Sequence, residues 1–265
     1  WAAEAYLART FLFYTGTYGK ADLAGVVSKA EATAYINDAV NNSGHGLVAD
    51  FANLWLAASF ENFVGEDNTE MVWTVRFNGS GKGNWDLHEG NRFQVNIAPR
   101  GGSIGRYATG WGGATVNPKL VDSYEAGDTR KAASFIDYAN ETYKGQPLNF
   151  DPQAREQRQY TGYSWKKYCP ITNEAGTAVV EANGGNFQID NYQDYAIIRF
   201  SDVLLMAAEL NLQSNPALAQ ADYDRVRDRA FKNTTHRKTV SLENIMKERQ
   251  LELALEGLRY FDLIR

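Results

Sequence analysis

The sequence predicts a mostly α-helical fold, with helical hairpins at both ends of the chain and a long loop-rich block with short strands between them. Near both ends, apolar residues recur at the spacing of amphipathic helices. In the middle, glycine and asparagine are frequent and helical periodicity is lost, which is typical of loops. We therefore expect one domain of 265 residues, with a helical block at 1–64, a loop-rich block at 65–195 and a second helical block at 196–265.

The composition is that of an ordinary globular protein, since 44% of the residues are hydrophobic and 22% are charged. A formal net charge of −5 and the lack of a long Lys/Arg run argue against a nucleic-acid partner. No stretch is apolar enough to cross a bilayer. Cys169 is the single cysteine, which excludes a disulfide framework and a metal site of several thiolates, and we expect no cofactor.

The first block begins with a helix over residues 1–16, whose small residues allow a neighbouring helix to pack closely. A second helix is expected from Ser28 to about Asn41, because Ser28 and Glu31 form an S-x-x-E capping box. A third helical piece, DFANLWLAASF, follows at 50–60. This arrangement is like the start of a superhelical array of helical hairpins.

The middle block opens with MVWTVRF at 71–77, whose alternating apolar and polar residues predict a short strand. The segments 78–93 and 98–118 are rich in glycine and asparagine, and loops of this length inside a domain are often functional. One short helix is expected near their end, with Asn117 as N-cap and Pro118 at the first helical position.

The third block returns to helices. The segment AIIRFSDVLLMAAELNL at 196–212 predicts one strongly apolar helix. Asn215 and Pro216 begin the next helix as N-cap and first position, and Ser241 caps the last one.

Three glutamates of the closing helix, Glu248, Glu252 and Glu256, stand four residues apart and would form one column. Like charges at this spacing are destabilising on an isolated helix, and apolar residues flank the column on both sides. Buried carboxylates need cations, so we expect a structural arginine network rather than a catalytic or metal site. The expected network comprises Glu248, Arg249, Glu252, Glu256, Arg259 and Asp262.

The segment KERQLELALEGLRYFDLIR closely resembles the E-R-x-x-E-L-x-x-E-G-x-R-x-x-D-L-x-R signature of SusD/RagB-like proteins. IIRFSDVLLMAAEL, DYDRVRDRA and AEAYLARTFLFYTG are similar to further motifs of that family, although Asp224 stands where asparagine is usual. The matching positions of the signature are Glu248, Arg249, Glu252, Leu253, Glu256, Gly257, Arg259, Asp262, Leu263 and Arg265. The resemblance covers both helical blocks and leaves the middle block uncovered.

The resemblance implies tetratricopeptide-like hairpins, an α-α superhelix, that support long loops. It also implies a lipoprotein exposed on the outer membrane of Bacteroidota-type bacteria, which binds glycans, or peptides in some members, and passes them to a SusC-like TonB-dependent transporter. In that family the signature at 248–265 is structural. Because the chain lacks an initiator Met and a signal-peptide pattern, we expect a fragment without the N-terminal part and its lipid-bearing cysteine.

A glycan site needs aromatic rings for the C–H faces of sugars, and amides, carboxylates or guanidinium groups for their hydroxyls. The middle loops offer such residues, with Trp111 flanked by Gly110 and Gly112. The candidate ligand-binding residues are Trp111, Trp85, Tyr107, Arg106, Asn84 and Arg92.

Two other classes of function stay open. A glycoside hydrolase needs two carboxylates across a bound sugar, and Asp86 and Glu89 beside Trp85 are the available pair, although nothing in their spacing singles them out. The helical array could instead bind only a partner protein.

Overall fold

The computed structural model of the chain describes residues 1–59, 63–80 and 82–265. The chain forms two compact units. The helical unit consists of Trp1–Asp50, Asp67–Thr74 and Ala196–Arg265. The loop-rich unit consists of Phe51–Glu66 and Val75–Tyr195. Residues 51–64, which we expected in the first helical block, belong to the loop-rich unit, and residues 67–74 of the expected middle block belong to the helical unit.

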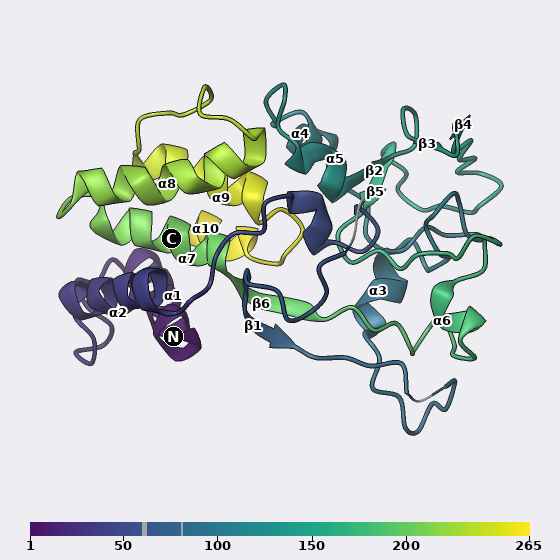
Figure 1. Cartoon of the computed structure of the whole chain (residues 1–265), viewed down its shortest axis with the longest axis horizontal. Coiled ribbons are helices and arrows are strands. Elements are labelled where there is room, and N and C mark those ends of the chain that lie inside the picture. The colour runs from purple at the N-terminus through teal and green to yellow at the C-terminus, as the bar shows by residue number, and fades with distance from the viewer. Residues whose placement is uncertain (60–62, 81) are drawn as a thin grey trace. The chain divides into compact units, whose positions relative to one another are not determined.

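The helical unit is built from two hairpins and a closing pair of helices (Figure 1). Helix α7 packs against α8, α2 and α9, and α1 packs against α2. The helices are α1 (Ala2–Tyr18), α2 (Lys29–Asn42), α7 (Phe200–Asn211), α8 (Pro216–Phe231), α9 (Leu242–Glu252) and α10 (Arg259–Ile264). Helices therefore form residues 2–18 and 29–42 of the predicted first block and most of the predicted last block.

Three of these helices begin at the N-cap residues that the sequence predicted. The Ser28 side chain accepts a hydrogen bond from the Glu31 N–H, and the Glu31 carboxylate accepts one from the Ser28 N–H at 2.8 Å, which completes the capping box. Asn215 caps α8 with Pro216 at its first position, and Ser241 caps α9. These local signals were sufficient because a cap involves residues only two or three positions apart.

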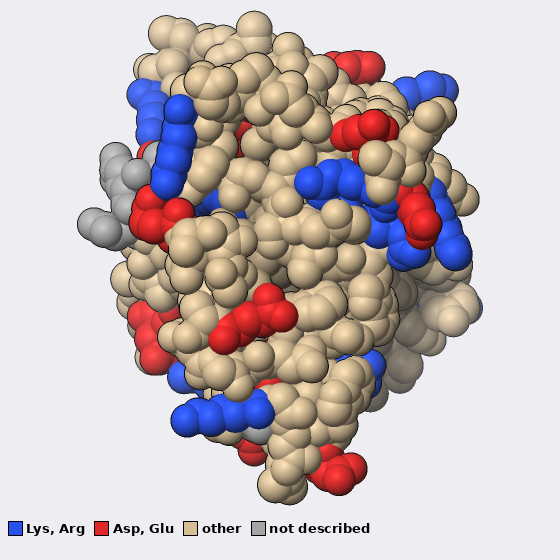
Figure 2. Space-filling view, turned by 90° about the vertical axis from the view of Figure 1, so that its right-hand side faces the viewer, with Lys and Arg blue, Asp and Glu red and all other residues tan. Residues whose placement is uncertain are grey.

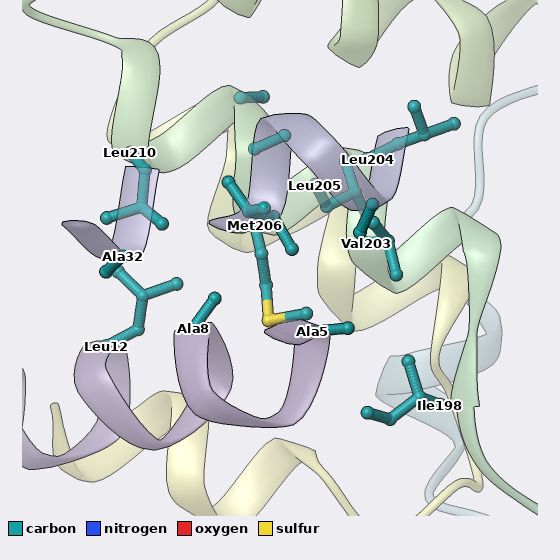
Figure 3. Packing of buried hydrophobic residues seen from close by; sticks show 14 of the residues in the cluster. Ala5, Ala8, Leu12, Ala32, Ile198, Val203, Leu204, Leu205, Met206 and Leu210 are labelled. Atoms are coloured by element: carbon teal, nitrogen blue, oxygen red, sulfur yellow. The ribbon is translucent and has the colours of Figure 1, made fainter. Parts of the chain in front are cut away.

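The core of the helical unit lies around α7, which is buried along almost its whole length. Figure 3 shows the Met206 side chain pointing from α7 toward Ala5 and Ala8 of α1, both fully buried. Alanine at these two positions leaves room for the long thioether, which explains the small residues of the first helix.

The start of the third block differs from the prediction. Residues Tyr195–Arg199 form strand β6, which pairs with β1 (Met71–Val75), and α7 begins only at Phe200. The Phe200 N–H donates to the Glu70 carbonyl at 2.8 Å, so a partner far away in sequence extends this segment. An apolar run such as AIIR is compatible with a buried strand as well as with a helix.

The end of the chain also differs from one continuous helix. Helix α9 ends at Glu252, Leu255 and Gly257 adopt positive φ values of 66° and 79°, and α10 follows. Glu256 therefore lies in the turn between two helices. The predicted third helical piece spans 50–60, of which residue 60 lies outside the described residues; among residues 50–59, only Phe51–Leu54 form a helix, the 3-10 helix η1.

The loop-rich unit contains short elements joined by long connections. Its helices are α3 (Arg92–Ile97), α4 (Pro118–Val121), α5 (Arg130–Ser134) and α6 (Val179–Ala182). Strand β2 (Phe135–Asp137) pairs antiparallel with β5 (Tyr163–Trp165), and β3 (Thr142–Tyr143) pairs with β4 (Gln146–Pro147). Asn117 caps α4 as predicted, and a buried cluster that includes Tyr107, Ile136 and Tyr138 provides a core.

Candidate functional site

Trp111 lies on a segment that packs directly on the C-terminal end of α3. The backbone N–H groups of residues 110–113 donate to the carbonyls of Pro99, Val95, Ala98 and Asn96, in that order, at 2.7 to 2.9 Å. A helix leaves its last carbonyls without partners inside the helix, and this segment satisfies several of them. The ladder holds the backbone of Trp111 in place while 39% of the residue stays exposed.

The glycines beside Trp111 allow this close approach. A Cβ atom on Gly110 would lie 2.4 Å from the Val95 carbonyl oxygen. One on Gly112 would lie 2.4 Å from Gln157 Oε1, and Gly112 has a φ of +60°, which favours glycine. From the sequence, we interpreted the glycines as neighbours too small to bury the tryptophan. In the structure they also allow its backbone to pack against α3.

A groove of about 630 Å³ opens beside the Trp111 ring. One aromatic face, amide groups and guanidinium groups meet here, which are the groups that recognise a sugar ring and its hydroxyls. The groove is lined by Asn96, Arg100, Trp111, Gly112, Gly113, Arg158 and Gln159.

Polar side chains hold the groove walls. Arg100 lies with Nη1 3.4 Å from the Trp111 carbonyl oxygen and Nη2 3.6 Å from the Glu156 carboxylate. Gln157 Nε2 donates to the Gly112 carbonyl at 3.0 Å. Arg155 Nη1 donates to the carbonyl of Arg100 at 3.1 Å. Residues 155–157 therefore contact the segments that carry Arg100 and Trp111, and they directly precede Arg158 and Gln159, which line the groove although they lie far along the chain from Trp111.

Trp85 forms a second exposed aromatic platform, with 48% of the residue exposed. The Arg92 guanidinium lies 5.4 Å from the centroid of its ring, and Asn84 accepts the Asp86 N–H in a tight turn. The loop is anchored by the buried Asp190, whose Oδ2 accepts from the Gly83 N–H at 2.6 Å.

Helix α3 connects the two platforms. Arg92, beside Trp85, and Asn96, beside Trp111, are exposed and stand four residues apart on α3, so they share one face of the helix. The Asn96 amide donates to the Arg92 carbonyl at 2.9 Å. We define the α3 surface as Trp85, Arg92, Asn96, Arg100, Trp111, Arg158 and Gln159.

Tyr107 and Arg106 do not fit the expected role in ligand binding. Tyr107 is 1% exposed, packs in the buried cluster with Ile136, and donates its hydroxyl to Glu141. Burial, together with the Glu141 charge, raises the pKa of Tyr107 well above its usual value. Arg106 is half-buried, and Nη1 and Nη2 donate to the carbonyls of Ser59 and Leu56. Both side chains stabilise the loops through contacts inside the loop-rich unit, so we leave them out of the α3 surface.

The carboxylate pair considered for hydrolysis is not part of the groove. Asp86 and Glu89 are exposed, and the Glu89 carboxylate accepts hydrogen bonds from Asn78 and Ser80. Neither residue lines the groove beside Trp111. Within residues 1–59, 63–80 and 82–265, no group of three His, Cys, Asp or Glu is arranged to hold a metal ion.

The glutamates of the closing segment contact arginines from other elements. Glu252 pairs with Arg199 at 3.0 Å and with Arg229 at 2.5 Å, and Glu256 pairs with Arg199. Glu248 pairs with Arg227 at 2.6 Å. Arginine partners are therefore present as expected, but they come from β6 and α8 rather than from the closing segment itself.

The two arginines predicted to serve these glutamates have other surroundings. Arg249 pairs with Asp202 and Asp262 instead of Glu252. Arg259 forms no ion pair with any residue that the structure describes, so its place in the network was wrong. The reason is that α9 ends at Glu252 and residues 253–258 form a turn, so Arg259 at the start of α10 is out of the helical register of the glutamates.

Sequence reasoning missed Asn96, Arg100, Arg158 and Gln159 as groove residues. Asn96 follows the candidate Arg92 by one helical turn, a signal that a predicted α3 would have provided, whereas Arg100 lies beyond the end of that helix. For Arg158 and Gln159 no local pattern exists, because only the folded chain brings them beside Trp111.

Charges of both signs are mixed on the face of the molecule that Figure 2 shows. Figure 2 shows one face of the molecule on which Lys and Arg form small groups, interleaved with acidic groups and surrounded by uncharged residues. That face has no extended basic stripe of the kind that follows a phosphate backbone. Within the described part of the chain, no helix has both the length and the hydrophobicity that a membrane span requires.

Comparison with known proteins gives one family. The sequence model of the SusD family matches residues 69–265. A SusD-like protein from Bacteroides ovatus is 24% identical over 280 aligned positions, which cover 100% of this chain and 45% of the relative.

Solved structures agree. A laminarin binding SusD-like protein is 27% identical, with a TM-score of 0.74 over 99% of this chain and 53% of its own. Surface glycan-binding protein A from Bacteroides thetaiotaomicron in complex with laminarihexaose is 21% identical, with a TM-score of 0.73 over 98% of this chain and 54% of its own. The chain thus spans about half the length of the relatives it matches, and these likenesses support the tetratricopeptide-like fold.

Proposed function

The chain belongs to the SusD family, and on that premise we propose that it binds oligo- or polysaccharides through the α3 surface. The observation that carries the proposal is Trp111, 39% exposed and held on α3 by a backbone ladder beside a groove with polar walls. The laminarin and laminarihexaose named for two similar structures support a glycan as the class of ligand.

The chemistry of the α3 surface fits a sugar chain. A pyranose ring can place its C–H face on the Trp111 ring, and Trp85 offers a second face along the same helix. The hydroxyls would then meet the amides of Asn96 and Gln159. Because a sugar exchanges water hydrogen bonds for protein ones at little net gain, binding to one sugar should be weak. Repeated contacts along a polysaccharide would raise the apparent affinity.

We further propose that the protein works at the outer surface of the outer membrane, anchored by a lipid, and delivers its glycan to a SusC-like TonB-dependent transporter. Family membership supports this role, and the similar proteins named as surface glycan-binding proteins support the location. Protease treatment of intact cells should remove the protein, and affinity purification from solubilised membranes should recover the transporter. Protection from protease, or recovery without any transporter, would contradict this part of the proposal.

Calorimetric titration of the purified protein with a panel of polysaccharides and peptides, followed by chromatography of the products, tests the function. We expect heat of binding with at least one polysaccharide and no shortening of its chains. Cleavage products would instead support the hydrolase alternative. Binding of peptides without binding of any polysaccharide would support the peptide-binding class.

A further inference from the structure

We infer that the groove beside Trp111 takes an acidic glycan, one whose sugars carry carboxylate or sulfate groups. This inference rests on the proposed function and names the class of ligand. It starts from the charge of the groove walls. Arg100 and Arg158 both line the groove, and no carboxylate is among its lining residues. The whole chain carries a formal charge of −5, so a cationic groove is a local departure from the overall balance.

Arg158 has no acidic partner among the described residues, and Arg100 has only a highly exposed one. Arg158 is exposed, and its guanidinium forms no ion pair or hydrogen bond with residues 1–59, 63–80 or 82–265. Arg100 lies 3.6 Å from the carboxylate of Glu156, whose side chain is 82% exposed. An ion pair with so exposed a partner contributes little, and water or a ligand anion can replace it easily.

A third cation lies next to the groove. Arg155 donates to the carbonyls of Arg100, Gly102 and Ser103 at 2.7 to 3.2 Å. Carbonyl oxygens satisfy its N–H groups without cancelling its charge. The nearest acidic residue before it in sequence, Asp151, accepts the N–H groups of its own turn, from Gln153 and Ala154. Near the groove, the three guanidinium groups of these arginines are thus accompanied by one solvent-exposed carboxylate, that of Glu156.

Guanidinium groups suit these anions because two parallel N–H groups match two oxygens of a carboxylate or a sulfate ester. Arg100 lies beside the Trp111 carbonyl, so an anion it binds belongs to a sugar at the Trp111 ring or to its neighbour. Arg158 is free to contact a second charged group. The groove therefore combines a stacking ring, amides for hydroxyls and cations for acidic substituents.

The test compares glycans that differ in charge. Polygalacturonate supplies carboxylates, carrageenan supplies sulfate esters, and laminarin and xyloglucan are neutral. We expect calorimetry with purified protein to detect an acidic glycan, with an affinity that falls several-fold between about 20 mM and about 300 mM salt, because added ions screen exposed charges. Whichever of the two acidic polymers binds identifies the anion as carboxylate or sulfate.

Variants separate the groove from the overall charge. Arg158→Gln should weaken binding of the acidic glycan by roughly three- to ten-fold, since a charge-assisted hydrogen bond is lost at an exposed site. Lys247→Gln is the control, because it removes one positive charge from an exposed position on α9. Its affinity should equal that of the parent.

The possible failures are distinguishable. Binding of laminarin or xyloglucan without binding of either acidic polymer would overturn the inference and leave the proposed function standing. Equal weakening by Arg158→Gln and Lys247→Gln would also overturn it, because the effect would then be one of net charge. A folded protein that binds no glycan of either kind would overturn the proposed function as well.

Discussion

Arg199 holds both carboxylate oxygens of Glu256 in a two-pronged pair: Nε and Nη2 each donate at 2.8 Å. Both residues are buried. Arg199 ends β6, whereas Glu256 lies in the turn after α9, so the pair joins two segments 57 positions apart. Arg199 Nη1 also reaches Glu70 and Glu252. This guanidinium group therefore fixes the strand, the end of the helix and the turn against one another.

Removal of Glu252 should destabilise the protein strongly. Glu252→Ala leaves Arg199 and Arg229 buried with less negative charge, and breaking a buried pair in this way costs about 3–5 kcal/mol. Urea unfolding followed by circular dichroism measures the loss. Glu243→Ala, at an exposed position of the same helix, should stay within about 0.5 kcal/mol of the parent. An unchanged midpoint for Glu252→Ala would show that the network contributes nothing to stability.

Met206 should show the sensitivity of a closely packed core. Its side chain is buried against Ala5 and Ala8, so Met206→Ala opens a cavity and should lower the free energy of unfolding by about 2–5 kcal/mol. Met206→Leu nearly conserves volume and should cost less than about 1.5 kcal/mol. Equal decreases in the free energy of unfolding for the two variants would show that the volume of the side chain at position 206 does not determine stability.

Asp222 should make stability depend on pH. It is buried in α8 with Oδ2 lacking a hydrogen bond from the described residues, and burial raises its pKa to about 6, against the opposing effect of Arg225. A carboxyl whose pKa is higher in the folded state favours folding below its unfolded pKa of about 3.9. That stability is lost as pH rises through 6.

Asp222→Asn removes this titration. At pH about 7.5 the free energy of unfolding of the variant should exceed that of the parent by about 1–2 kcal/mol, and near pH 4 the two free energies should agree. Urea unfolding at both pH values measures the difference. A variant that is less stable than the parent at neutral pH would show that the ionised carboxylate stabilises α8.

Gly112 should be needed both for stability and for the position of Trp111. Gly112→Ala forces a residue with Cβ into a φ of +60° and places that atom 2.4 Å from Gln157 Oε1. Gly44 has a φ of +75° with open space around it, so Gly44→Ala isolates the backbone effect of about 1 kcal/mol. Gly112→Ala should cost more than Gly44→Ala in thermal unfolding and should also weaken glycan binding. Equal costs would show that the loop accommodates the extra atom.

The sequence predicted those parts of the fold that local contacts determine. Ser28, Asn117, Asn215 and Ser241 each cap a helix through a residue two or three positions away, and all four were predicted. The β-strand at 195–199 was missed because its partner strand begins at Met71. A contact over more than a hundred positions leaves no trace in the periodicity of the apolar run AIIR.

The candidate site was predictable to a similar extent. Trp85 and Trp111 were found because exposed loops rich in glycine offer aromatic rings few neighbours. Tyr107 shares the loop but points into the core, where Glu141 accepts its hydroxyl hydrogen. In an irregular loop, tertiary packing determines which side chains are buried and which are exposed. Composition alone therefore could not show that Tyr107 is buried and Trp111 exposed.

Calorimetric titration of Trp111→Ala with a polysaccharide that the parent protein binds tests the central claim most directly. Loss of the stacking ring should remove detectable binding while the thermal midpoint stays close to that of the parent. Trp73→Ala is the matched control, because Trp73 is 45% exposed in β1 of the helical unit and does not line the groove. The account predicts unchanged affinity for Trp73→Ala. Unchanged affinity in a folded Trp111→Ala variant would contradict it and place the glycan elsewhere.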